Sequence, residues 1–171
     1  NRRVMSRHWV MDFETLSNCF VAVFEHYKEP EVKVFAVCNL QNDFTSLVEF
    51  LNTNVARQEW HISYNGLAFD AQVTEFILDN HKALQELDGD EIAGAIYAFA
   101  QETIDLMRNK LFPKYSPYRM RIRQIDIFKL NHWDNPAKSS SLKWIQYSMD
   151  WWNVLDMPIH HTELITNKKD L

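Results

Sequence analysis

The chain has 171 residues, a length typical of one domain, and 46% of them are hydrophobic, enough to bury a substantial core. Three glycines and five prolines argue against a loop-rich or disordered chain. The net charge of −5 disfavours a general nucleic-acid coat protein. It does not exclude a nuclease, because the acids of a metal site add to that charge before any cation binds.

The hydrophobic pattern predicts the element order βββαβα, then an extra helix, then a final βα unit. The expected strands are 8–14, 19–27, 31–39, 61–64 and 121–128, and the expected helices are 43–56 (capped by Asp43), Phe69 into the eighties, 90–111, and Ser141 to Met149. Short turns followed by crossovers predict an α/β fold with a mixed five-stranded sheet flanked by helices. We expect one domain over residues 1–171, in which 81–118 is a helical insertion that buttresses the core or grips a strand or partner.

The two cysteines and the hydropathy pattern indicate where the protein works. Cys19 and Cys38 fall in apolar strand-like runs without metal-ligand spacing, so we interpret them as small core residues in the reducing cytoplasm. No apolar run approaches a membrane span, and no signal-peptide pattern opens the sequence. We therefore expect no membrane partner.

Residues 10–15 hold two carboxylates two positions apart, at the end of a short apolar run. In a strand, residues i and i+2 point to the same face, so Asp12 and Glu14 would present their oxygens to one point. Oxygen clusters of this kind suit Mg²⁺ or Mn²⁺. The alternative is an ordinary half-buried strand with two solvated acids.

A third carboxylate follows the predicted strand that ends at Tyr64. The pair Asn65-Gly66 is typical of a turn, and a helical pattern starts near Phe69. Asp70 then falls in the first helical turn, where the helix dipole favours a carboxylate. A strand end and the adjoining helix start share one edge of an α/β sheet, where functional sites collect. Asp70 is therefore either a third member of the site or simply a favourable helix-start residue.

These two segments resemble a known family. Asp12-Phe13-Glu14-Thr15 resembles the first motif of the DEDD superfamily of 3′–5′ exonucleases. Residues 65–70, with the pattern Asn-x-x-x-Phe-Asp, resemble the second motif in the form seen in the proofreading domains of B-family DNA polymerases. The resemblance extends through 123–130 and a Ser-Leu-Lys helix start at 141–143, and thus covers most of the chain. It implies an RNase H-like fold.

The resemblance also implies a function and a site. The expected activity is metal-dependent hydrolysis of the terminal phosphodiester at a single-stranded 3′ end of DNA or RNA. Asp12, Glu14 and Asp70 would be catalytic and would hold two Mg²⁺ or Mn²⁺ ions. A polymerase domain or subunit is an expected partner, with a role in DNA replication. The residues expected to contact the terminal nucleotide are Thr15, Asn65 and Phe69.

The fourth acid of that family is missing from its expected place. It lies on a late helix in Tyr-x-x-x-Asp or His-x-x-x-x-Asp, and neither pattern follows residues 141–143. We therefore expect either a C-terminally truncated, weakly active chain or a naturally degenerate site. Asp126, flanked by apolar residues, is a candidate replacement metal ligand; alternatively, it caps a loop or accepts backbone hydrogen bonds. The alternative function is a catalytically inactive nucleic-acid-binding or docking module with the same fold.

A group of basic residues precedes and enters the last predicted strand. Arg119, Arg121 and Arg123 alternate with apolar residues, so we expect all three on one strand face. They would either contact phosphates along the path of a bound strand or form a solvated edge-strand face that prevents aggregation. The sequence leaves both interpretations open.

Overall fold

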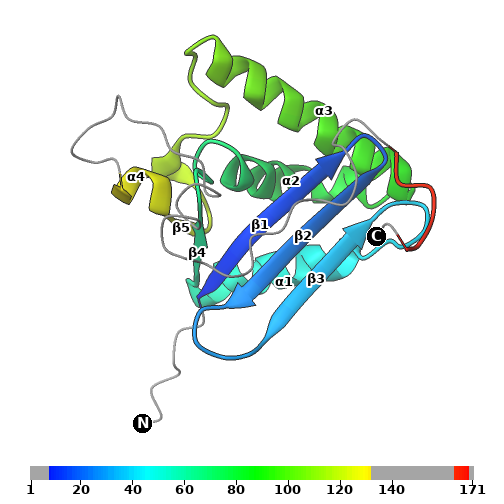
Figure 1. The fold of residues 1–171 in the computed structure, drawn as a ribbon, viewed down its shortest axis with the longest axis horizontal. Coiled ribbons are helices and arrows are strands. Elements are labelled where there is room, and N and C mark those ends of the chain that lie inside the picture. The colour runs from blue at the N-terminus through cyan, green and yellow to red at the C-terminus, as the bar shows by residue number, and fades with distance from the viewer. Residues whose placement is uncertain (1–7, 132–163, 170–171) are drawn as a thin grey trace.

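A computed structural model describes residues 8–131 and 164–169 of the chain. Its elements are, in order, β1 (Trp9–Leu16), β2 (Cys19–His26), β3 (Val32–Val37), α1 (Phe44–Arg57), β4 (Trp60–Ser63), α2 (Asp70–Leu84), α3 (Gly89–Arg108), the 3₁₀ helix η1 (Pro117–Arg119), β5 (Arg123–Asp126) and α4 (Ile127–Asn131). The expected α/β fold, a mixed five-stranded sheet flanked by helices, is confirmed (Figure 1).

The strands follow one another across the sheet in the order β3-β2-β1-β4-β5. β1 pairs antiparallel with β2 along its whole length, and β2 pairs antiparallel with β3. β4 lies parallel to both β1 and β5, which requires the crossovers that α1, α2 and α3 supply. β4 is short and ends beside the middle of β1, so the loop after β4 opens next to the β1 backbone.

Helices α1, α2 and α3 cover one face of the sheet, behind β1, β2 and β3 in Figure 1. Strand β1 shows the consequence as an alternation of buried and exposed residues from Trp9 to Glu14. Trp9, Met11 and Phe13 are buried in the core, whereas Asp12 and Glu14 are exposed on the opposite face. The period-2 side-chain pattern of a strand therefore places both carboxylates on the face away from the core, as predicted.

Helix α3 lies within the segment predicted as a helical insertion, and it closes the core. Its buried residues Ile92 and Ile96 belong to the same apolar cluster as Phe13 of β1. The ring of Phe99 stacks on Phe76 of α2 with centroids 4.4 Å apart. α3 thus buttresses the sheet, which supports the first of the two interpretations given for this segment.

The three arginines do not share a strand face, because the chain pairs as a strand only from Arg123 onward. Arg119 ends η1, and β5 begins only at Arg123 and ends at Asp126. Arg121 donates from its backbone N–H and its guanidinium to Glu75 at 2.7 and 3.2 Å, and its guanidinium also bonds Asp79. The expectation of one shared strand face is therefore wrong.

Three smaller expectations can be compared with the structure. The side chain of Asp43 does not cap α1; its Oδ2 instead accepts from the Ala36 N–H and from Gln41 Nε2, at 3.0 and 2.6 Å. Cys19 and Cys38 are buried free thiols, as expected for core residues. Within the described ranges, no helix combines the length and apolarity needed to cross a bilayer. The predicted helix at 141–149 lies outside the described residues.

Candidate active site

The three predicted acids meet where β4 ends beside β1. The last ladder pair between these strands is Val10↔Ile62. Beyond it the chain leaves β4 and turns into α2, which brings Asp70 to the β1 backbone. The pKa of Asp70 responds to the charges of Asp12 and Glu14 and to the Phe13 N–H, a main-chain group that acts on Asp12 as well. Asp70 therefore lies near this part of β1, and we call Asp12, Glu14 and Asp70 the acidic cluster.

The charges of the acidic cluster act on one another. Burial, together with the charges of Asp12 and Glu14, raises the pKa of Asp70 to about 7, although backbone hydrogen bonds oppose the shift. Partial desolvation raises the pKa of Glu14, and the charge of Asp12 adds to the effect. Desolvation also raises the pKa of Asp12 even though its residue is exposed on the sheet face. All three pairs of acids therefore interact: Asp12 with Glu14, and each of these two with Asp70.

The donor chemistry of the acidic cluster fits a divalent cation. Carboxylate oxygens are the ligands that Mg²⁺ and Mn²⁺ prefer, and a cation would stabilise the charged form of Asp70, which burial and the neighbouring charges disfavour. Among residues 8–131 and 164–169, no three His, Cys, Asp or Glu side chains are arranged as a ready-made metal site. The acidic cluster therefore fits a divalent cation in the type of its donor atoms and in its charge.

Ser63 is a neighbour of Asp70 that the sequence did not reveal. It ends β4 and is 2% exposed, and its Oγ has no hydrogen-bond partner among the described residues. A Cβ on Gly66 would overlap Ser63 Oγ and would lie 3.3 Å from Asp70 Oδ2. Glycine at position 66 thus lets an unpaired hydroxyl and the Asp70 carboxyl group share one small space. The Asn-Gly turn marks the glycine, but no sequence signal marks the serine.

Asp126 holds the loop that leads to Asp70. Its Oδ1 accepts from the N–H groups of Asn65 and Phe128 at 2.8 and 3.0 Å, and its Oδ2 accepts from the Leu67 N–H at 3.3 Å. Both carboxylate oxygens are thus engaged by main-chain donors. These contacts support the loop-capping interpretation of Asp126 and explain why β5 ends at this residue and α4 follows.

The three residues expected to bind substrate adjoin the acidic cluster along the chain. Thr15 follows Glu14 in β1 and is half-buried. Asn65 is exposed and has a φ of 58°, a left-handed conformation that asparagine tolerates better than most residues. Phe69 directly precedes Asp70 and packs its half-buried ring against the core. The assignment of these residues to substrate binding stays a prediction.

Comparisons with protein-family models, with curated proteins and with solved structures found no match to this chain. The motif residues and the geometry of the acidic cluster are therefore the observations that point to a function.

Proposed function

We propose that the protein is a metal-dependent 3′–5′ exonuclease that hydrolyses the terminal phosphodiester of a single-stranded nucleic acid. The observation that carries the proposal is the acidic cluster. Two strand residues and one helix-start residue, far apart in sequence, contribute three carboxyl groups that interact, and burial of Asp70 together with the charges of the other two raises its pKa to about 7. No cation in the described residues compensates this repulsion, whereas a bound divalent ion would do so.

The residues of the cluster have distinct roles in this proposal. Bound Mg²⁺ or Mn²⁺ would activate water and stabilise the leaving 3′ oxygen. Asp12 is placed to share ligation with both neighbours, because its charge acts on Glu14 and on Asp70. Asp70, the first residue of α2, supplies the third carboxyl group from the neighbouring element. Asp126 fixes the loop that carries Asn65, so this loop keeps its shape when a terminal nucleotide binds.

The test is cleavage of a 5′-labelled single-stranded oligonucleotide in Mn²⁺. We expect successive release of 3′ mononucleotides, abolished by excess chelator. Asp12→Asn should lower the rate by about 100-fold or more, equivalent to about 3 kcal/mol of transition-state stabilisation. The matched control is Glu25→Gln, an exposed carboxylate on β2 opposite Val10 on the same open face, which should leave the rate unchanged.

Two results would contradict the proposal. Cleavage that persists in excess chelator would reject the metal, and an unchanged rate in Asp12→Asn would reject the acidic cluster as the site. Binding of Mn²⁺ and of the oligonucleotide by the wild-type protein without any cleavage would instead identify the inactive nucleic-acid-binding module.

A further inference from the structure

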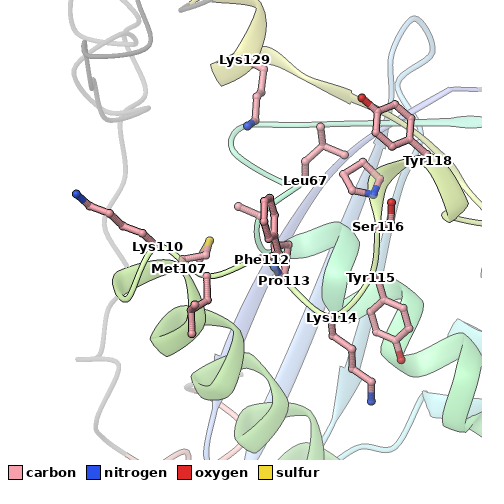
Figure 2. A pocket seen from close by; sticks show the side chains of 13 residues that line it. Leu67, Met107, Lys110, Phe112, Pro113, Lys114, Tyr115, Ser116, Tyr118 and Lys129 are labelled. Carbon is pink, nitrogen blue, oxygen red and sulfur yellow. The ribbon is translucent and has the colours of Figure 1, made fainter.

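A pocket of about 710 Å³ lies beside the loop that leads to Asp70 (Figure 2). One wall is the loop itself, through Leu67 and Ala68. The other wall is the chain between Met107 at the end of α3 and Tyr118 in η1, and Lys129 of α4 borders the pocket from above in Figure 2. The pocket therefore adjoins the acidic cluster through the same loop that Asp126 holds.

The two walls are joined by one buried side chain. Gln72, which is fully buried in α2, donates from Nε2 to the carbonyl oxygens of Leu67 and Tyr115 at 3.2 and 2.8 Å. Its Oε1 accepts from the Tyr115 N–H at 2.9 Å. Because Gln72 bonds both loops, the pocket has a fixed width and a fixed position relative to Asp70, two residues before Gln72 in the same helix.

Two exposed aromatic rings line the pocket. Phe112 is 94% exposed and Tyr118 is 98% exposed, the two most exposed large apolar side chains among the described residues. Neither ring belongs to the core clusters. Rings held in solvent on a short loop, with their faces uncovered, are suited to stacking against planar groups.

The charge of the pocket is opposite to that of the chain. Lys110, Lys114 and Lys129 line it, and none of its described lining residues is acidic, although the whole chain carries −5. Figure 2 shows Lys129 reaching from α4 toward the pocket, whereas Lys110 and Lys114 extend away from Phe112 in different directions. The ammonium of Lys114 lies 5.6 Å from the centre of the Tyr115 ring. For Lys110 and Lys129, the described residues include no salt-bridge partner.

We propose that this pocket binds single-stranded nucleic acid next to the terminal nucleotide, with Phe112 and Tyr118 stacking on bases and Lys110 and Lys129 contacting phosphates. The inference rests on the proposed function and adds to it the place where the strand is held. Base–aromatic stacking combined with lysine–phosphate contacts is the usual chemistry of single-strand binding. A protein partner is disfavoured, because lysine is depleted at protein–protein interfaces.

Binding is tested separately from cleavage, in excess chelator, by fluorescence anisotropy of labelled oligo(dT) and oligo(U). Tyr118→Ala should weaken binding on the order of 10-fold, the loss expected for one stacked base, whereas Tyr118→Phe should bind like wild type. Lys110→Glu combined with Lys129→Glu should weaken binding at least as much and should flatten its dependence on salt. The control is Lys28→Glu, an exposed lysine in the β2–β3 turn, with an unchanged thermal midpoint required of every variant.

The outcomes separate this inference from the proposed function. Wild-type affinity in both the Tyr118→Ala and the double lysine variant would show that the pocket does not bind the strand, even if Asp12→Asn abolishes cleavage. Loss of binding in those variants supports the pocket even if the protein cleaves nothing. Equal affinity for a blunt duplex would overturn the stacking role, because paired bases do not expose their faces. A preference between oligo(dT) and oligo(U) that disappears in Tyr118→Ala would support the stacking role. The preferred oligonucleotide would show whether the protein binds DNA or RNA.

Discussion

The two ends of the β1–β4 pair hold polar side chains in opposite ways. At the amino end, four buried side chains are joined by hydrogen bonds, with only His61 Nδ1 left without a partner among the described residues. At the carboxyl end, the acidic cluster gathers three groups of the same charge beside an unpaired serine hydroxyl. Both sites use the same two strands and the same register, so the difference lies in the side chains that the sequence places at each end.

The amino-end cluster consists of Trp9, Asn54, Glu59 and His61, all buried. Trp9 Nε1 donates to Glu59 Oε2 at 3.0 Å. The Asn54 amide, oriented so that both its polar atoms are satisfied, donates to Glu59 at 2.9 Å and accepts from His61 Nε2 at 2.9 Å. Burial lowers the pKa of His61 to about 3, so the ring is neutral and carries its proton on Nε2. The partnered groups offset much of the cost of burying polar atoms at this end, although His61 Nδ1 has no hydrogen-bond partner among the described residues.

The carboxyl end has no such compensation among the described residues. Desolvation and like charges act on Asp70 in the same direction and outweigh its backbone hydrogen bonds. Proteins keep local arrangements of this kind mainly where function needs them. We therefore expect the amino end to contribute to stability and, under the proposed function, the carboxyl end to contribute to activity, and each of the following experiments can break that division.

The largest effect on stability should come from Glu59→Ala at the amino end. The change leaves Trp9 Nε1 and the Asn54 amide without their acceptor, so we expect a loss of about 3 kcal/mol in the free energy of unfolding. Urea unfolding followed by circular dichroism measures it. Glu59→Gln keeps one acceptor and should lose less, and Glu49→Ala, an exposed acid in α1, should change stability by less than about 0.5 kcal/mol. If Glu59→Ala behaved like Glu49→Ala, the amino-end cluster would not be a source of stability.

Asp70→Asn at the carboxyl end should instead increase the free energy of unfolding. At pH 8 the wild-type carboxylate is ionised against its raised pKa, and asparagine removes that charge while keeping an oxygen for the Phe13 N–H. We expect a gain on the order of 2 kcal/mol, since one pKa unit corresponds to about 1.4 kcal/mol and relaxation reduces the full shift. Denaturant unfolding at pH 8 measures the gain, and a destabilised variant would contradict the repulsion argument.

The pH dependence of the same variant sharpens the comparison. Asp70 has a raised pKa in the folded state, so the folded state binds more protons than the unfolded state, and wild-type stability falls as the pH rises from about 3.8 to about 7. His61 has a lowered pKa, so its contribution falls as the pH drops from about 6.5 to about 3. The two slopes oppose each other in the wild type. Asp70→Asn removes the Asp70 slope while the His61 slope stays, so the stability of the variant should rise more steeply with pH between 4 and 6.5 than that of the wild type.

Much of this fold could be predicted from the sequence, because its signals are local. The period-2 burial of β1 placed Asp12 and Glu14 on one face, and the Asn-Gly turn placed Asp70 at a helix start. The limits of β5 could not be predicted in this way. Asp126 reaches back across the sheet to the 65–67 loop, and this long-range contact ends the strand where an apolar pattern continues.

The parts of the site that the sequence did not reveal also depend on long-range contacts. Ser63 becomes an unpaired neighbour of Asp70 only because Gly66 allows the loop to close over it. Gln72 joins two loops that are more than forty residues apart, and no spacing rule anticipates such a pair. The prediction from the arginine alternation was wrong for the same reason. Arg121 forms ion pairs with Glu75 and Asp79 of α2 at a position where a strand was expected.

The smallest expected effect is metal-linked stabilisation, which should appear at the carboxyl end alone. A ligand that binds only the folded state adds RT ln(1 + [L]/Kd), about 1.4 kcal/mol when free Mn²⁺ is tenfold above its dissociation constant. We expect Mn²⁺ to raise the thermal midpoint of the wild type by a few degrees and to leave Asp70→Asn unchanged, because that variant lacks both a ligand and the repulsion that a cation relieves. Glu59→Gln is the matched control: it alters a buried acid of the same sheet region at the other end, so it should respond to Mn²⁺ like the wild type. A response that survives in Asp70→Asn but disappears in Glu59→Gln would reverse the assignment of the two ends, since the buried carboxyl group of Glu59 would then be the cation's partner.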